Sequence, residues 1–186
     1  MGQRSEIYVA YEMANGQKKI TARYFDWNYE ERMISRVRYT SEWLSRRMRS
    51  CSTINKDDFI PIIETNFDMV DHIQSAKIEP ATFKPFKLHI KASDFLNDGR
   101  AFIYVNLEGE VKYCFTNNRD LKPMDCDNYM LFDTECNYDY AKWINPEYKN
   151  SKKMSQCRKN IKWLSRNANL MTQAELDDFL DADYVS

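Results

Sequence analysis

Residues 6–24 of this 186-residue chain read EIYVAYEMANGQKKITARY. Asn15-Gly16 is the strongest two-residue turn signal a sequence offers, because a type I′ turn needs positive φ at both central residues. Folding the chain about that turn places Tyr8 opposite Arg23. The sequence therefore predicts an N-terminal β-hairpin with a defined register.

In that register the two faces of the hairpin separate with a period of two residues. The predicted apolar face joins Ile7, Val9, Tyr11, Ile20, Ala22 and Tyr24. The predicted polar face joins Glu6, Tyr8, Glu12, Lys19, Thr21 and Arg23. An amphipathic hairpin resting on a core explains this pattern, and so does a polar face that binds a partner.

A helix of about 20 residues is predicted directly after the hairpin, with Asn28 as its N-cap. Its core stripe is Met33, Val37, Leu44 and Met48. A second stripe, about 120° away, mixes guanidinium groups with aromatic rings: Arg32, Arg36, Tyr39, Trp43 and Arg47. Arginine suits phosphate, and aromatic rings suit unpaired bases, so this stripe is a candidate nucleic-acid surface. The alternative is a solvated basic face with Trp43 packed against the hairpin.

The rest of the chain predicts an α+β fold in one domain, residues 1–186, because 186 residues can bury one substantial core. A hairpin-helix module occupies residues 1–50, and a basic helix followed by an acidic helix occupies residues 151–186. Glu108-Gly109 predicts a second hairpin and with it a further small antiparallel sheet. Thr172 and Glu175 form a capping box for the last helix. Weaker signals predict helices at 57–66 and 152–166, strands at 83–90 and 129–133, and a helical turn at 139–144.

The formal net charge of −1 conceals a strong internal polarisation. A basic block without any acid comprises Lys149, Lys152, Lys153, Arg158, Lys159, Lys162 and Arg166. An acidic tail without any base comprises Glu175, Asp177, Asp178, Asp181 and Asp183. So many cations exclude imitation of DNA by bulk negative charge, whereas local basic patches stay open.

Catalytic and metal-binding motifs are sparse, and we expect neither a cofactor nor a bound metal. No P-loop, GxSxG, HExxH or GxGxxG occurs. His72 and His89 are isolated, and Cys51 near two arginines is a weak nucleophile candidate. The acidic cluster Asp125, Asp127, Asp133, Glu135 and Asp139 lacks the spacing of a calcium loop. Five cysteines without CxxC spacing, no signal peptide and no transmembrane stretch favour a cytoplasmic protein without a membrane partner.

Three N-terminal motifs carry a family resemblance: MGQRSEIYV at 1–9, YFDWNY at 24–29 and ERMISR at 31–36. They resemble the start of small proteins from Firmicutes phages and mobile elements, among them type II-A anti-CRISPR proteins. The resemblance covers about the first quarter of the chain, and Glu30 stands where we expect glycine. It implies two partners, a type II RNA-guided effector nuclease and its guide RNA. One member causes guide RNA to be shortened, with an N-terminal hairpin implicated, so the resemblance implies action on the guide.

Joining the two lines of reasoning, we expect the protein to inhibit the nuclease by shortening its guide RNA or blocking its use. If it cleaves RNA, Glu6 is the candidate base, Tyr8 orients or stacks, and Arg23 stabilises phosphate. The candidate nucleic-acid or partner surface is Arg4, Arg32, Arg36, Tyr39, Trp43 and Arg47. Two alternatives stay open: a stoichiometric nuclease binder without catalysis, and an unrelated RNA-binding protein of a mobile element.

Overall fold

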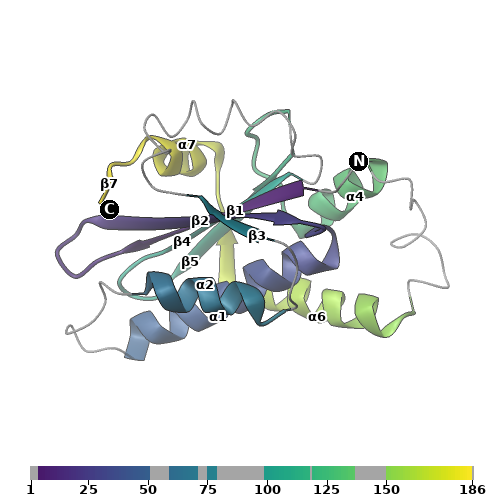
Figure 1. The fold of residues 1–186 in the computed structure, drawn as a ribbon, viewed down its shortest axis with the longest axis horizontal. Helices are drawn as coiled ribbons and strands as arrows, with labels where there is room; N and C mark the ends of the chain where they lie inside the picture. Colours follow the sequence, from purple (N-terminus) through teal and green to yellow (C-terminus); the bar gives the residue numbers. More distant parts are fainter. Residues whose placement is uncertain are drawn as a thin grey trace.

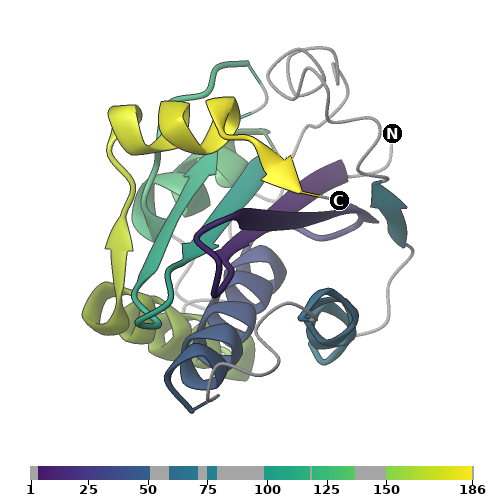
Figure 2. The same ribbon diagram turned by 90° about the vertical axis from the view of Figure 1, so that its left-hand side faces the viewer.

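The computed structural model describes residues 4–50, 59–70, 75–78, 99–117, 119–136 and 150–185. These residues form an α+β fold around one mixed sheet with strand order β3-β2-β1-β4-β5-β6, and β7 pairs with β2. Helices α1, α2 and α6 lie on one face of the sheet, and α7 lies on the other (Figures 1 and 2). The expected α+β class is thus confirmed.

The bounds of the elements follow the chain in the order of Figure 1. The strands are β1 (Arg4–Glu12), β2 (Lys18–Asp26), β3 (Ser75–Ile78), β4 (Arg100–Val105), β5 (Val111–Thr116), β6 (Ala168–Leu170) and β7 (Tyr184–Val185). The helices are α1 (Glu31–Ser50), α2 (Ile60–Asp68), α4 (Cys126–Cys136), α6 (Lys152–Asn167) and α7 (Gln173–Asp181).

The N-terminal hairpin forms, but its predicted register is wrong by one residue. Tyr8 lies opposite Ala22, and Ile7 lies opposite Arg23. The turn has three residues instead of two: Met13 N donates to Gln17 O at 2.8 Å. Such a loop is a type I turn followed by one left-handed residue, here Gly16 with φ of 81°.

Asn15 explains why the turn takes this form. Its side-chain oxygen accepts a hydrogen bond from Gln17 N at 2.9 Å, which is an Asx turn and leaves Asn15 itself at negative φ. The second hairpin repeats the geometry. Asn106 N donates to Glu110 O at 3.2 Å, and Gly109 is left-handed at 77°. Both turn positions were predicted correctly, and the loop length of the first was not.

The two hairpins join into one sheet, because β1 pairs in parallel with β4. The expected separate antiparallel sheet is therefore wrong. As a central strand between two helical layers, β1 is buried on both faces. Ile7 and Val9 face the larger core below α1, whereas Tyr8 and Ala10 face the smaller core below α7.

Two residues in the connection from β2 to α1 have an uncommon backbone conformation. Trp27 and Glu30 have positive φ, 60° and 48°, which is uncommon for residues other than glycine. Glycine expected at position 30 would take this conformation without strain. Asn28 was predicted to be the N-cap of α1, but it is not, because α1 begins at Glu31. Its side chain instead donates to Ser5 Oγ at 3.0 Å.

Most other helices follow the sequence signals. The core stripe of α1 is buried, Pro61 lies in the first turn of α2, and Thr172 and Glu175 form the predicted capping box of α7. The strand predicted at 129–133 is wrong, because these residues belong to α4, where Asp125 Oδ1 accepts from Asn128 N at 2.8 Å. The segments 83–90 and 139–144, with Cys51, His72, His89 and Lys149, lie outside the described residues.

Candidate cationic interface

Glu6 and Tyr8, two predicted catalytic residues, meet in a buried cluster on the α7 side of the sheet. Glu6 Oε2 accepts from Tyr8 Oη at 2.7 Å and from Arg100 Nε at 3.3 Å. Glu6 is 4% exposed and Tyr8 is fully buried. Burial, with the neighbouring Glu6 carboxylate, raises the pKa of Tyr8 well above its ordinary value. The tyrosine therefore stays a hydrogen-bond donor, and the cluster is closed to solvent.

Arg23, the third predicted catalytic residue, lies on the opposite face of the sheet. Its Nη1 contacts Asp68 Oδ1 at 3.0 Å and Glu64 O at 3.4 Å, both in α2. The one-residue register shift produces this separation, since it moves every β2 side chain to the other face. The predicted polar face containing Glu6, Tyr8 and Arg23 is therefore wrong.

Arg36, predicted to lie on the surface of α1, is fully buried. Its Nε donates to Asn28 Oδ1 at 2.7 Å, and its Nη1 donates to Phe67 O. The guanidinium also lies over the Phe25 ring, 4.8 Å from its centroid. Arg36 ties β2, α1 and α2 together. The prediction that it contacts a partner is therefore wrong, because the side chain is buried.

Every other arginine of α1 also contacts a group of this chain. Arg32 donates to Trp27 O at 2.9 Å, and Arg49 donates to Gly109 O at 3.3 Å. Arg38 and Arg46 both pair with Glu42, and Arg47 lies over the Trp43 ring. Arg4, at the start of β1, is exposed. The stripe predicted as a nucleic-acid surface thus makes contacts within the molecule, with Arg36 buried and Arg47 exposed.

The aromatic residues of α1 follow the same pattern. Trp43 packs edge-on against Phe59, the residue before α2, at 5.9 Å between centroids, and it is partly buried against the larger core. Tyr39 lies under Arg38, at 4.2 Å. Arg38 also reaches Trp163 of α6, at 5.3 Å. An arginine between two aromatic rings thus links the two helices.

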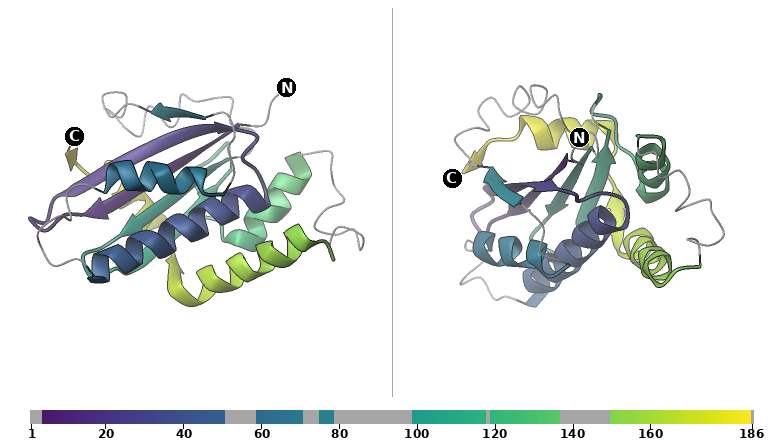
Figure 3. Two further views of the ribbon diagram at one scale, coloured as in Figure 1. Left: turned by 60° about the horizontal axis from the view of Figure 1, so that its bottom comes forward. Right: turned by 45° about the vertical axis from the view of Figure 1, so that its right-hand side comes forward.

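Helix α6 lies beside α1 and runs in the same direction (Figure 3). Lys153 approaches Glu31 at 4.0 Å, Asn160 donates to Ser35 at 2.9 Å, and the Arg38–Trp163 contact follows further along both helices. Met154, Cys157 and Leu164 are buried in the larger core, which also contains residues of α1 and of the sheet. This packing fixes which side of α6 faces solvent.

The side of α6 away from the core carries only cations among its charged residues. We define the α6 cationic face as the exposed residues Lys152, Arg158, Lys159, Lys162 and Arg166. Arg158, Lys162 and Arg166 follow one another at i, i+4 and i+8, which brings neighbouring side chains about 5–6 Å apart at Cβ. Within the residues that the structure describes, Lys152, Lys159, Lys162 and Arg166 form no ion pair.

This arrangement costs stability. Like charges at i and i+4 destabilise a helix by about 0.2–0.5 kcal/mol a pair, and α6 has no acidic residue to offset them. The sequence showed the basic block, but the candidate residues were chosen from α1. One feature of the sequence distinguishes the two helices: Glu42 and several aromatic residues lie near the arginines of α1 and can bind them, whereas α6 has no acidic residue.

Acidic residues are concentrated on α7, across the sheet from α6. Asp178 and Asp181 are exposed there, and Asp177 is partly exposed. Glu175 pairs with Lys112 of β5 at 2.7 Å, and that contact together with the Thr172 cap lowers the pKa of Glu175. Negative charge thus gathers on the face opposite the α6 cationic face.

The described residues bring no metal-ligand cluster together, and the cysteine side chains that the structure describes are buried. No group of three or more histidine, cysteine, aspartate or glutamate side chains there could hold a metal ion. Cys114, Cys126 and Cys157 are free and buried, and burial raises the pKa of Cys126 and Cys157 to about 12. In the same residues no helix has the length and apolarity needed to cross a membrane.

Comparison with known proteins adds no assignment: no family model, curated protein or solved structure matches this chain. The resemblance of the N-terminal motifs to type II-A anti-CRISPR proteins therefore stays a prediction. The contacts of the molecule itself identify the α6 cationic face as the best candidate interface.

Proposed function

We propose that this protein is an anti-CRISPR inhibitor that binds the guide RNA of a type II effector nuclease and blocks its use without cleaving it. The α6 cationic face is the contact surface. The sequence predicts that the hairpin and α1 shorten the guide RNA or block its use, whereas the exposed cations that support blocking lie on α6.

The observation that carries the proposal is the exposed, acid-free row of cations on α6. An anionic polymer relieves the repulsion between Arg158, Lys162 and Arg166, because a phosphate placed between neighbouring cations screens both. Each phosphate contact also releases condensed counterions, which makes the affinity strongly salt-dependent. A small acidic protein patch relieves fewer of these charges than a continuous phosphate backbone does.

The N-terminal motifs support the choice of RNA. Their resemblance to type II-A anti-CRISPR proteins points to a guide RNA inside the cytoplasm of a bacterial host. Base pairing by that guide is what gives the nuclease its target. A protein bound along the guide backbone keeps the guide from loading or from pairing with DNA.

Burial favours blocking over cleavage. A general base must come within hydrogen-bond reach of the proton that it removes. Glu6 is 4% exposed, and its Oε2 already accepts from Tyr8 and Arg100. A ribose 2′-hydroxyl reaches Glu6 only after this cluster opens. Binding of the guide RNA without cleavage needs no such opening, so we favour it over catalysis.

One incubation tests the proposal. Guide RNA is mixed with the protein, with and without the effector nuclease, and is then resolved for length on a denaturing gel and for mobility on a native gel. We expect retarded mobility with unchanged length, and inhibition that needs about one protein per nuclease. Unbound guide, with or without inhibition, would overturn the α6 proposal.

Guide shortening would support the catalytic alternative, and two conditions locate its source. Loss of shortening in Glu6→Gln, with binding retained, would assign it to the buried cluster. Loss on addition of EDTA would instead assign it to a metal held by carboxylates such as Asp125 and Asp127. Binding of unrelated RNA as tightly as guide, without nuclease inhibition, would favour the general RNA-binding alternative.

A further inference from the structure

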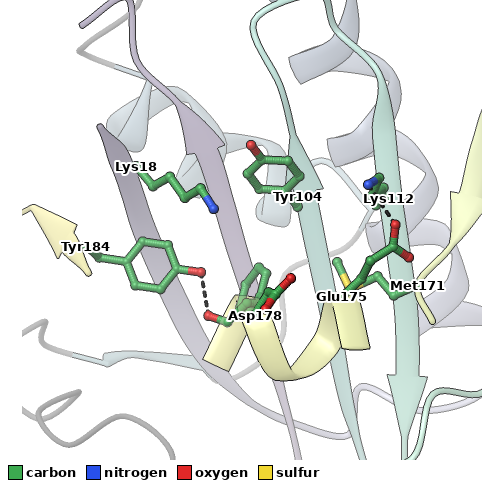
Figure 4. A pocket seen from close by; sticks show the side chains of 8 residues that line it. Lys18, Tyr104, Lys112, Met171, Glu175, Asp178 and Tyr184 are labelled. Carbon is green, nitrogen blue, oxygen red and sulfur yellow. Dashed lines mark hydrogen bonds and ion pairs between the residues drawn. The ribbon is translucent and has the colours of Figure 1, made fainter. Parts of the chain in front are cut away.

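A pocket of about 200 Å³ lies between α7 and the sheet, on the face opposite α1. It is lined by Lys18, Tyr104, Lys112, Met171, Glu175, Asp178, Phe179 and Tyr184. These residues come from β2, β4, β5, β7 and α7 and, for Met171, from the link between β6 and α7 (Figure 4). None of them belongs to the α6 cationic face, so the pocket is independent of the proposed function.

Two of the four charged groups in the pocket neutralise each other. Lys112 Nζ lies 2.7 Å from Glu175 Oε1. Glu175 also caps α7 by accepting from Thr172 N at 2.8 Å. This pair is part of the framework that holds α7 on the sheet, and it leaves little capacity for a ligand.

The other two charged groups keep their binding capacity. Lys18 Nζ lies over the Tyr104 ring, 5.3 Å from its centroid, and Asp178 is exposed on α7. Neither forms an ion pair within the described part of the chain. Figure 4 shows the Lys18 ammonium directed into the space between Tyr104 and Tyr184, with Asp178 on the α7 side. The pocket thus offers one cation and one anion from facing walls.

Tyr104 adds a neutral donor beside the ammonium. Burial, together with the charges of Glu12 and Glu108, raises the pKa of Tyr104 to about 12, so its hydroxyl keeps its proton at neutral pH. The hydroxyl of Tyr184 is already engaged, since it donates to Phe179 O at 2.7 Å. Lys18 and Tyr104 are therefore the groups that can receive a carboxylate.

The floor of the pocket is apolar. Met171 and Phe179 are buried side chains, and both line it. Its volume is below the range of about 300–1,000 Å³ that suits drug-sized ligands, so a smaller molecule fits. One carboxylate, one ammonium and one apolar side chain on a small skeleton describe a free amino acid.

We propose that this pocket binds a free α-amino acid with an apolar side chain. The carboxylate lies against Lys18 and the Tyr104 hydroxyl, the ammonium lies against Asp178, and the side chain rests on Met171 and Phe179. Binding needs both charges of the ligand, because each meets a protein group of opposite sign.

Calorimetric titration of the full chain with L-leucine, L-methionine and L-phenylalanine tests the proposal. We expect at least one of them to bind with a Kd of about 1 mM or tighter. The leucine analogues 4-methylpentanoate, which lacks the amino group, and 3-methylbutylamine, which lacks the carboxylate, should each bind at least about tenfold more weakly than leucine. This comparison needs no variant, so it does not depend on how a substitution affects folding.

Variants then locate the site for whichever amino acid binds. Lys18→Met and Asp178→Asn should each weaken binding by about tenfold or more, since each removes the protein charge that faces a ligand charge of opposite sign. The matched controls Lys122→Met and Asp181→Asn change side chains that do not line the pocket and should leave binding unchanged. Absence of binding by all three amino acids, equal binding of an analogue, or equal loss in the controls would overturn the proposal.

Discussion

Helices α1 and α6 carry the same number of cations, six each, but they use them in opposite ways. Each arginine of α1 contacts a carbonyl, a carboxylate, an amide or an aromatic ring of this chain. On α6, Lys152, Lys159, Lys162 and Arg166 are exposed and form no ion pair with the described residues. Equal charge in the sequence therefore does not mean equal availability to a partner.

The difference follows from residue type and neighbours. Arginine has a rigid fork of donors that reaches carbonyls and stacks on rings, and α1 supplies both. Glu42 lies one turn from Arg38 and from Arg46 and binds them both. Helix α6 is richer in lysine, a strongly hydrated point charge, and contains no acid. Lys152, Lys159, Lys162 and Arg166 consequently stay in solvent.

Arg36→Met should show the structural role of α1 most strongly. The substitution leaves Asn28 Oδ1 and Phe67 O buried without their donor, and each unsatisfied group costs about 1–3 kcal/mol. We expect the free energy of unfolding in urea to fall by about 2–5 kcal/mol. A change below about 0.5 kcal/mol, as at a solvated position, would mean that Arg36 is not the buried link described above.

Gly109→Ala should be the next largest effect, because the second hairpin turn rests on α1. A methyl group there would approach Ser45 O to 2.7 Å and Arg49 Cγ to 2.8 Å. Gly16→Ala is the matched control, since Gly16 has a similar φ and nothing within 4 Å of the added Cβ. We expect about 1–2 kcal/mol for Gly16 from the left-handed backbone alone and a clearly larger loss for Gly109. Equal losses in thermal or urea unfolding would argue against close packing of this turn on α1.

Arg38→Met tests the link between the two helices. It removes the pair with Glu42 and the contacts with the Tyr39 and Trp163 rings, while the methionine keeps most of the apolar stem. Because the Arg38 side chain is still 17% exposed, we expect a loss of only about 1 kcal/mol, measured by urea unfolding. RNA binding should not change, and a large loss of affinity in a stable variant would place Arg38 in the interface.

Replacing Arg32 and Arg47 by Glu should have the smallest effect on guide RNA binding. Both residues were expected to contact nucleic acid, but both contact their own helix or its N-terminal connection. We expect the Kd measured by fluorescence anisotropy to change by less than about threefold, since surface charges away from a contact act only through a screened field. A loss of affinity as large as that of an α6 variant would show that the α1 surface contacts the guide RNA after all.

The sequence predicted the elements better than it predicted the surfaces. Period-two and helical patterns located both hairpins, the core stripe of α1 and the capping box of α7, because these depend on neighbours in the chain. The loop length at Asn15 depended on one hydrogen bond to Gln17 N, and that bond moved Arg23 to the other face. The burial of Arg36 depended on α2, which is distant in sequence, and no local pattern indicates such a contact.

The same reasoning explains the two sites that the sequence did not give. The α6 cationic face was visible as a basic block, but only the packing on α1 and the sheet identified which side stays in solvent. The pocket joins residues from five elements and the link between β6 and α7, so it could not be found without the fold. Local chemistry was readable from the sequence, whereas its accessibility was not.

Guide RNA affinity of two matched triple variants is the most direct test of the central claim. One variant replaces Arg158, Lys162 and Arg166 of α6 by Glu, and the other replaces Arg32, Arg46 and Arg47 of α1 by Glu, with the same change in net charge. Loss of three phosphate contacts should weaken binding by about 50-fold at about 0.15 M salt and lower the slope of log Kd against log salt by about 2. We expect this loss of affinity for the α6 variant and not for the α1 variant. Equal affinity of the two variants would contradict the claim that α6 is the RNA-binding helix.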